Sequence, residues 1–157
     1  MAINKALEKE IQLIRKYFDF LFKDDFEITS TKYDYQNFGN WIIALQSRNE
    51  IVRFYQDRGE IYALIGPPWA SRSLDDSQHF FDLRIIVSFL EDSESIKIGN
   101  TGKLNNQLES LAKIFLNYYT RITSIFNDES FPQVEEKLKI HRQKLLSNFS
   151  PIFKKKD

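Results

Sequence analysis

The residues best suited to recognition chemistry lie in one stretch, Arg53 to Trp69, which reads RFYQDRGEIYALIGPPW. An arginine guanidinium beside aromatic rings can stack on them, and it can also grip a carboxylate or a phosphate through two parallel hydrogen bonds. Arginine, tyrosine and tryptophan also anchor protein interfaces. The candidate binding residues, in this stretch and just after it, are Arg53, Tyr55, Arg58, Tyr62, Trp69 and Arg72.

The sequence offers less for catalysis. His79 lies near Asp75, Asp76 and Asp82 and is the one candidate base, because carboxylates raise the affinity of an imidazole for a proton. A solvated first turn of a helix accounts for the same cluster. His141 falls on an apolar stripe, which is typical of a core or boundary histidine. The chain has no G-x-S-x-G turn for a serine nucleophile. With no cysteine and only two histidines, far apart in the sequence, it also lacks the usual ligands of a metal site. We therefore assign no catalytic residue, no metal site and no cofactor.

Composition places the chain among ordinary globular proteins. Its 157 residues fit one domain, 1–157, in which we expect residues 150–157 to be a frayed tail. A net charge of zero argues against general nucleic-acid binding. The absence of cysteine fits a reducing compartment. With no secretory signal and no long apolar run, we expect a cytoplasmic protein without membrane association.

Alternation of apolar and polar residues predicts an antiparallel meander between Phe26 and Gly66. The expected strands are Phe26–Tyr35, Trp41–Ser47, Glu50–Asp57 and Glu60–Gly66, joined by QNFGN, RN and RG. In the last connection, Gly59 can supply the positive φ of a tight hairpin.

The two short connections also predict the strand register, because a two-residue loop fixes which residues face each other. Phe54 should then face both Ile43 and Ala63. The opposite, second face of the sheet should hold Arg53, Tyr55 and Tyr62, and we expect that face to be exposed. The alternative is that the amino-terminal helix covers it, or that Arg53 pairs internally with an acid.

Helical periodicity predicts one helix before the strands and three after them. The expected helices are Ile3–Phe22, Leu74–Leu90 after a cap formed by Ser73 and Asp76, a long helix from residue 102 or 103 to Phe126, and a last helix beginning near Ser130 and Pro132. The predicted fold class is therefore α+β, a four-stranded antiparallel meander preceded by one helix and followed by three, with the helices mainly on one sheet face.

The block GNWIIALQSRNEIVRFYQDRGEIYALIGPPW, Gly39 to Trp69, contains an aromatic strand, an I-R-F type strand and a D-R-G hairpin. It resembles a type of small bacterial α+β protein usually labelled uncharacterised, some members of which resemble the immunity partners of bacterial toxins. The resemblance contains no catalytic motif, and it implies protein binding as the function.

Together these observations favour a non-enzymatic macromolecule-binding protein of the immunity or adaptor type, whose partner is another protein. The alternative is a small-molecule-binding protein or an enzyme, with an anionic ligand held by Arg53 and Arg72 between the sheet and the Pro67-Pro68 segment, and with His79 as base. A homodimer through the same surface is the third hypothesis.

Overall fold

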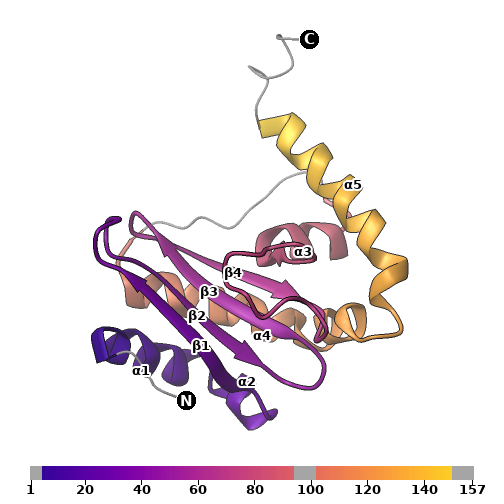
Figure 1. Ribbon diagram of the computed structural model, residues 1–157. Helices are drawn as coiled ribbons and strands as arrows, with labels where there is room; N and C mark the ends of the chain where they lie inside the picture. Colours follow the sequence, from indigo (N-terminus) through magenta and orange to yellow (C-terminus); the bar gives the residue numbers. More distant parts are fainter. Residues whose placement is uncertain (1–4, 94–101, 150–157) are drawn as a thin grey trace.

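A computed structural model describes residues 5–93 and 102–149, and within them five strands form one antiparallel sheet in chain order, β1-β2-β3-β4-β5 (Figure 1). The strands are β1 (Glu27–Asp34), β2 (Asn40–Gln46), β3 (Ile51–Asp57), β4 (Glu60–Gly66) and β5 (Phe81–Asp82). The helices are the 3₁₀ helix η1 (Lys5–Leu7), α1 (Glu8–Tyr17), α2 (Asp19–Lys23), α3 (Leu83–Leu90), α4 (Leu104–Phe126) and α5 (Phe131–Phe149).

The predicted α+β class and antiparallel meander are confirmed, with two corrections in the number of elements. The sheet has a fifth, two-residue strand, β5, beside β4. The helix expected from Ile3 to Phe22 is divided among η1, α1 and α2, because the backbone leaves α-helical geometry at Leu7 (φ −110°, ψ 12°) and again at Phe18 (φ −107°, ψ 30°). The expected tail at 150–157 lies outside the described residues.

The predicted register of the central strands is confirmed. Phe54 faces Ile43 on β2 and Ala63 on β4, and Val52 faces Leu45 and Ile65 in the same way. The β3–β4 turn needs only Arg58 and Gly59, whose φ angles of 53° and 87° are both positive, as a type I′ hairpin turn requires.

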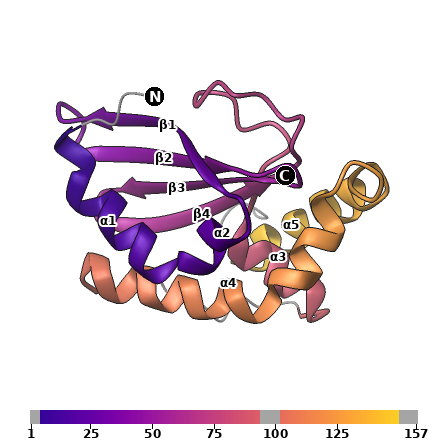
Figure 2. The ribbon, with the colours of Figure 1, turned by 90° about the horizontal axis from the view of Figure 1, so that it is seen from below.

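The helices α1, α2, α3 and α4 cover one face of the sheet, and the segment between β4 and β5 lies on the other face (Figure 2). The side chains between sheet and helices are fully or almost fully buried and include Phe18, Phe54, Phe115 and Phe126. Burial of a side chain of this size stabilises the fold by about 2–3 kcal/mol. We call this the inner face and the opposite one the outer face.

The side chain of Gln107 joins the β3–β4 turn to helix α4 by hydrogen bonds. Its side-chain oxygen accepts a hydrogen bond from the Ile61 amide at 2.9 Å, and its amide nitrogen donates to the carbonyl oxygens of Gly59 (2.8 Å) and Gly102 (2.9 Å). The residue is buried, and each polar atom of its side chain has a partner. The turn therefore has a fixed position over the amino-terminal end of α4.

Glu50 places a carboxyl group in the interior beside α4. The residue is fully buried. Its Oε1 accepts a hydrogen bond from the Thr123 hydroxyl at 3.2 Å, and its Oε2 has no hydrogen-bond partner among the described residues. Burial raises the pKa of Glu50 to about 7, against the lowering effect of the Thr123 hydrogen bond and with a further raising effect from the charge of Asp24.

The helix expected from Leu74 to Leu90 is wrong in its first half. Residues 67–80 form an irregular loop, β5 follows, and α3 begins only at Leu83. The cap is Asp82, whose side chain accepts a hydrogen bond from the Arg84 amide at 2.8 Å, and not Ser73. His79 has a φ of 75°, which no helix can contain. The starts of α4 and α5 agree with the sequence-based prediction.

Candidate functional site

The six sequence-predicted binding residues do not form one site. Arg53 and Arg72 lie where the 67–80 loop crosses the sheet, and both line the same cavity. Tyr55 and Tyr62 stack on the outer face. Arg58 occupies the β3–β4 turn, and Trp69 follows the opposite end of β4. These positions therefore belong to separate features of the structure.

Arg53 is buried, which contradicts the expectation that it emerges from an open sheet face. Only 3% of the residue is exposed. Its Nη1 donates to the carbonyl oxygen of Asp76 at 2.7 Å, and its Nη2 donates to those of Ser71 (2.7 Å) and Ser73 (3.0 Å). The outer face is thus covered here, as the alternative proposed, but by a loop instead of the amino-terminal helix. The partners are carbonyl groups and not acids.

Phe80 completes this anchor of the 67–80 loop. The Arg53 guanidinium carbon lies 3.8 Å from the centroid of the Phe80 ring, a close cation–π contact. The ring also lies against Gly66, where an added Cβ would come within 2.8 Å of it. Phe80 forms a second, smaller apolar cluster with Ile51 and Ala70. Arg53 therefore holds the loop on the outer face by charge-assisted hydrogen bonds and ring stacking together.

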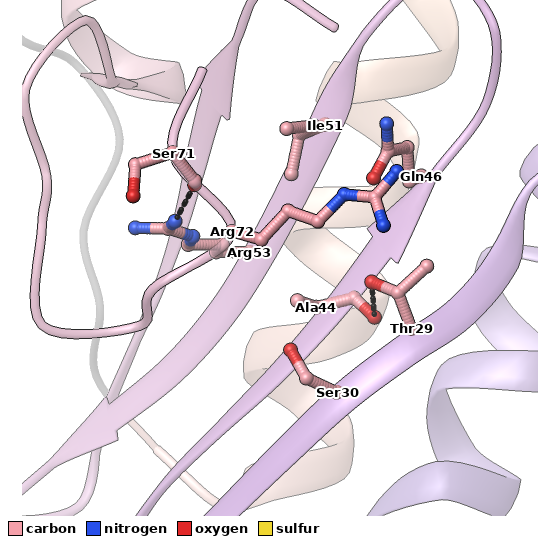
Figure 3. Close-up of a pocket in the computed structure, with 8 residues that line it drawn as sticks. All are labelled: Thr29, Ser30, Ala44, Gln46, Ile51, Arg53, Ser71 and Arg72. Atoms are coloured by element: carbon pink, nitrogen blue, oxygen red, sulfur yellow. Dashed lines mark hydrogen bonds between the residues drawn. The ribbon is translucent and has the colours of Figure 1, made fainter. Parts of the chain in front are cut away.

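A cavity of about 100 Å³ lies between the 67–80 loop and strands β1 to β3. Figure 3 shows the two arginine side chains in it turned away from each other, with the guanidinium of Arg53 toward Ser71 and that of Arg72 over β2 toward Gln46. Arg72 is exposed and makes no ion pair or side-chain hydrogen bond with the described residues. The structure thus brings the two arginines to one cavity but does not point them at one spot.

Tyr55 and Tyr62 face each other on β3 and β4, with ring centroids 4.8 Å apart and an interplanar angle of 16°. Arg84 lies over the Tyr62 ring at 5.0 Å and pairs with Asp82 through two hydrogen bonds, at 3.0 and 2.9 Å. Burial raises the pKa of Tyr55 to about 12, so its phenol is neutral at physiological pH. The two half-buried, stacked rings therefore form an ordered part of the outer face.

In the part of the chain that the structure describes, the most exposed aromatic residues lie at the sheet end that carries the β1–β2 and β3–β4 turns. Tyr35 and Phe38 are 72% and 69% exposed, and the Arg58 guanidinium carbon lies 5.0 Å from the Phe38 ring centroid. Phe38 has a φ of 60°, which is uncommon for a residue with a side chain and costs free energy. We call Tyr35, Phe38 and Arg58 the tip surface. Neither aromatic residue is among the predicted binding residues, because the alternation pattern makes Tyr35 the last residue of a strand and Phe38 part of the QNFGN connection.

An open groove of about 240 Å³ lies beside the tip surface on the outer face. Ile42, Tyr55 and the almost fully buried Trp41 line it together with charged and amide side chains from β1, the β1–β2 turn, β2 and the end of β3; these are Lys32, Asp34, Asn37, Asn40, Gln56 and Asp57. We call it the tip groove.

Trp69 and His79 lie at the other end of β4 and contact α5. The two rings meet edge to face at 4.8 Å, and the Nδ1 of His79 lies 2.5 Å from a carboxylate oxygen of Glu135. The expected partners of His79, Asp75, Asp76 and Asp82, make no hydrogen bond with it. A carboxylate that orients a histidine also occurs in catalytic sites, but among the described residues no serine or threonine forms a hydrogen bond with His79. The pair joins the 67–80 loop to α5.

His141 behaves as a boundary histidine, in agreement with the sequence. Its Nε2 lies 2.9 Å from the Ser88 hydroxyl, and the Phe89 ring packs against it at 5.8 Å. Across residues 5–93 and 102–149 no group of three or more histidine, cysteine, aspartate or glutamate side chains is placed to hold a metal ion. None of the helices in these ranges is long and apolar enough to cross a bilayer.

Comparison of the chain with protein-family models, curated proteins and solved structures finds no match.

Proposed function

We propose that this chain is a non-enzymatic protein-binding protein of the immunity or adaptor type, and that its tip surface makes the contact. The observation that carries the proposal is the exposure of Tyr35 and Phe38, at 72% and 69%, beside Arg58 on two adjacent turns. Aromatic and arginine side chains are enriched among the residues that dominate binding energy. In the free chain most of the surface of these two side chains faces water instead of the core.

The turns that carry these residues are held in place before any partner arrives. The Arg58 amide donates to the side-chain oxygen of Asn40 at 2.9 Å, and the Asn40 amide group donates to Asp57 at 3.3 Å. The side-chain amide of Gln107 donates a hydrogen bond to the Gly59 carbonyl oxygen from the inner side of the sheet. A contact surface that is ordered in advance loses less conformational entropy on binding, which favours a specific interface at the tip.

Phe38→Asn tests this proposal without a loss of fold, because asparagine tolerates positive φ better than phenylalanine. The full chain would be immobilised and its captured partners compared by quantitative mass spectrometry. Leu116→Gln is the matched control, since Leu116 is an apolar residue on α4 that is 56% exposed. We expect a partner that the wild type and Leu116→Gln retain and that Phe38→Asn loses. Equal capture by all three proteins contradicts the proposal.

Self-association is the competing outcome of the same variants. Light scattering of the wild type and of Phe38→Asn measures it directly. A dimer that Phe38→Asn converts to a monomer assigns the tip surface to a second copy of the chain.

A small anionic ligand is the second candidate function, and the cavity beside Arg72 supports it. Arg53 and Arg72 both line the cavity, and the buried Nε of Arg53 has no hydrogen-bond partner among the described residues. Phosphate and citrate are suitable probes, with the thermal unfolding midpoint as the measurement. We expect stabilisation that Arg72→Ala removes; an equal response of both proteins contradicts a site at this cavity.

A further inference from the structure

The tip groove differs from a small-molecule site in size and in lining. Its volume of about 240 Å³ is below the range of roughly 300–1,000 Å³ that is usual for small-molecule pockets. Its apolar lining comes from Ile42, Tyr55 and the almost fully buried Trp41, and the other lining residues carry a carboxylate, an amide or, at Lys32, an ammonium group. Space and lining of this kind suit one long side chain with a polar head.

The charges at the groove are unbalanced. Asp34 has no side-chain hydrogen bond or ion pair with the described residues, and Asp57 accepts one hydrogen bond, from Asn40 at 3.3 Å. Lys32 is the one cation lining the groove, and it lies 3.1 Å from Asp75 of the 67–80 loop. Because Asp75 offsets that charge, the two carboxylates of the groove dominate its local potential.

Arg58 does not restore the balance. Its Nε is 3.9 Å from Asp57, at the outer limit of an ion pair, and both side chains are more than half exposed. The guanidinium lies over the Phe38 ring instead. Glu60, at the other side of the turn, adds a further exposed acid and accepts a hydrogen bond from the Tyr62 hydroxyl.

We propose that the tip groove receives an arginine or lysine side chain from the protein that docks on the tip surface, with the cation between Asp34 and Asp57 and its aliphatic stem on Ile42 and Tyr55. This inference rests on the proposed function and names the chemistry of the partner. A guanidinium would donate to both carboxylates, and Phe38 and Tyr35 would pack on the apolar residues around the partner's basic side chain.

The probe is N-acetyl-arginine methylamide, titrated into the uniformly ¹⁵N-labelled full chain, with N-acetyl-norleucine methylamide as the neutral control of similar length. We expect the arginine probe to shift the backbone amide signals of Asn37, Asn40 and Asp57 with millimolar affinity, and the norleucine probe to shift them much less. Added sodium chloride should weaken the interaction, because the charges are solvent-accessible.

Substitutions that remove a negative charge and one that removes a positive charge should change probe binding in opposite directions, which distinguishes an effect of charge from an effect on the structure. Asp34→Asn and Asp57→Asn should each weaken binding of the arginine probe about two- to fivefold, as for an exposed ion pair. Lys32→Gln should strengthen it, since this change removes the groove's cation and releases Asp75. Equal affinity of the two probes, no shift of these three signals, or the same response to all three variants overturns the inference.

Its failure is distinguishable from failure of the proposed function. If Phe38→Asn abolishes partner capture while the arginine probe does not bind, the tip surface is an interface without a basic anchor. If the arginine probe binds as expected while Phe38→Asn leaves capture unchanged, the groove recognises cations but the tip surface does not recruit the captured protein.

Discussion

Glu50→Gln offers the sharpest test of how the interior of this protein is built. The carboxyl group of Glu50 is fully buried, and burial raises its pKa from 4.5 to about 7. Well below pH 4.5 the folded and unfolded states both hold the proton, so burial of the neutral acid carries no charge penalty. As the pH rises toward 7, the unfolded chain releases the proton and the folded protein retains it, and the free energy of unfolding falls.

The magnitude follows from the two pKa values. At about 1.4 kcal/mol for each pH unit, the difference between 4.5 and about 7 corresponds to a loss of about 3 kcal/mol, complete above pH 7. Glutamine has nearly the same shape, keeps an oxygen for the Thr123 hydroxyl and never ionises. The variant should therefore gain about 3 kcal/mol over the wild type between about pH 4.5 and pH 8.

Urea unfolding at a series of pH values, followed by tryptophan fluorescence, measures this difference. The neighbouring polar groups are the Asp24 carboxylate, which accepts a hydrogen bond from the Tyr119 hydroxyl, and Thr123. Burial raises the pKa of Tyr119, so its phenol is neutral throughout this range. Glu27→Gln, which removes an exposed carboxylate, is the control. If wild type and Glu50→Gln show parallel pH profiles, Glu50 is not the buried titrating group inferred here.

Three further predictions concern the 67–80 loop and the tip. Arg53→Lys should destabilise the fold by about 2–3 kcal/mol, because an ammonium group cannot replace the geometry of hydrogen bonds to three carbonyls; thermal unfolding and proteolysis within the loop report it, with Arg72→Ala as a near-neutral control. Gly66→Ala should cost about 1–3 kcal/mol, since the new methyl group displaces the Phe80 ring, and an unchanged denaturation midpoint argues against that contact. Arg58→Asn creates an Asn-Gly turn and should leave stability unchanged or raise it by up to about 1 kcal/mol, whereas a clear drop in midpoint means that the arginine stack over the neighbouring turn holds the hairpin.

The central sheet was predictable from the sequence because its constraints are local. The loops Arg48-Asn49 and Arg58-Gly59 each leave one way to pair the flanking strands, and both pairings occur in the structure. The hydrogen bond from the Ser47 amide to the Glu50 carbonyl, at 3.0 Å, closes the first loop. The second closes through positive φ at both residues.

The covering of the outer face depends on contacts between distant residues, and local patterns do not encode it. Ser73 and Asp76 resemble a helix cap, yet their carbonyl groups accept hydrogen bonds from Arg53, which lies 20 and 23 positions earlier in the chain. One feature of the sequence did indicate that the sheet is covered around Arg53. The residues that flank Arg53 on its own face are Ala44 and Leu64, and apolar neighbours of this kind indicate a covered surface.

The sequence anticipated only part of the candidate tip surface. Arg58 is one of the predicted binding residues, but Tyr35 and Phe38, which are 72% and 69% exposed, are not, because strand patterning makes Tyr35 the last residue of a strand and Phe38 part of a connection. Aromatic side chains beside a turn glycine are a usable signal, because a turn needs polar or small residues and gains nothing from an exposed ring.

The anchor of the 67–80 loop has an evolutionary consequence. Arg53 contacts the main chain of Ser71, Ser73 and Asp76, and every residue type carries the same carbonyl group. Selection can therefore exchange the side chains of that loop while its path over the sheet persists. In diverging descendants of this chain we expect position 53 to stay arginine and the residues it holds to vary, so that a constant scaffold can display changing surface chemistry.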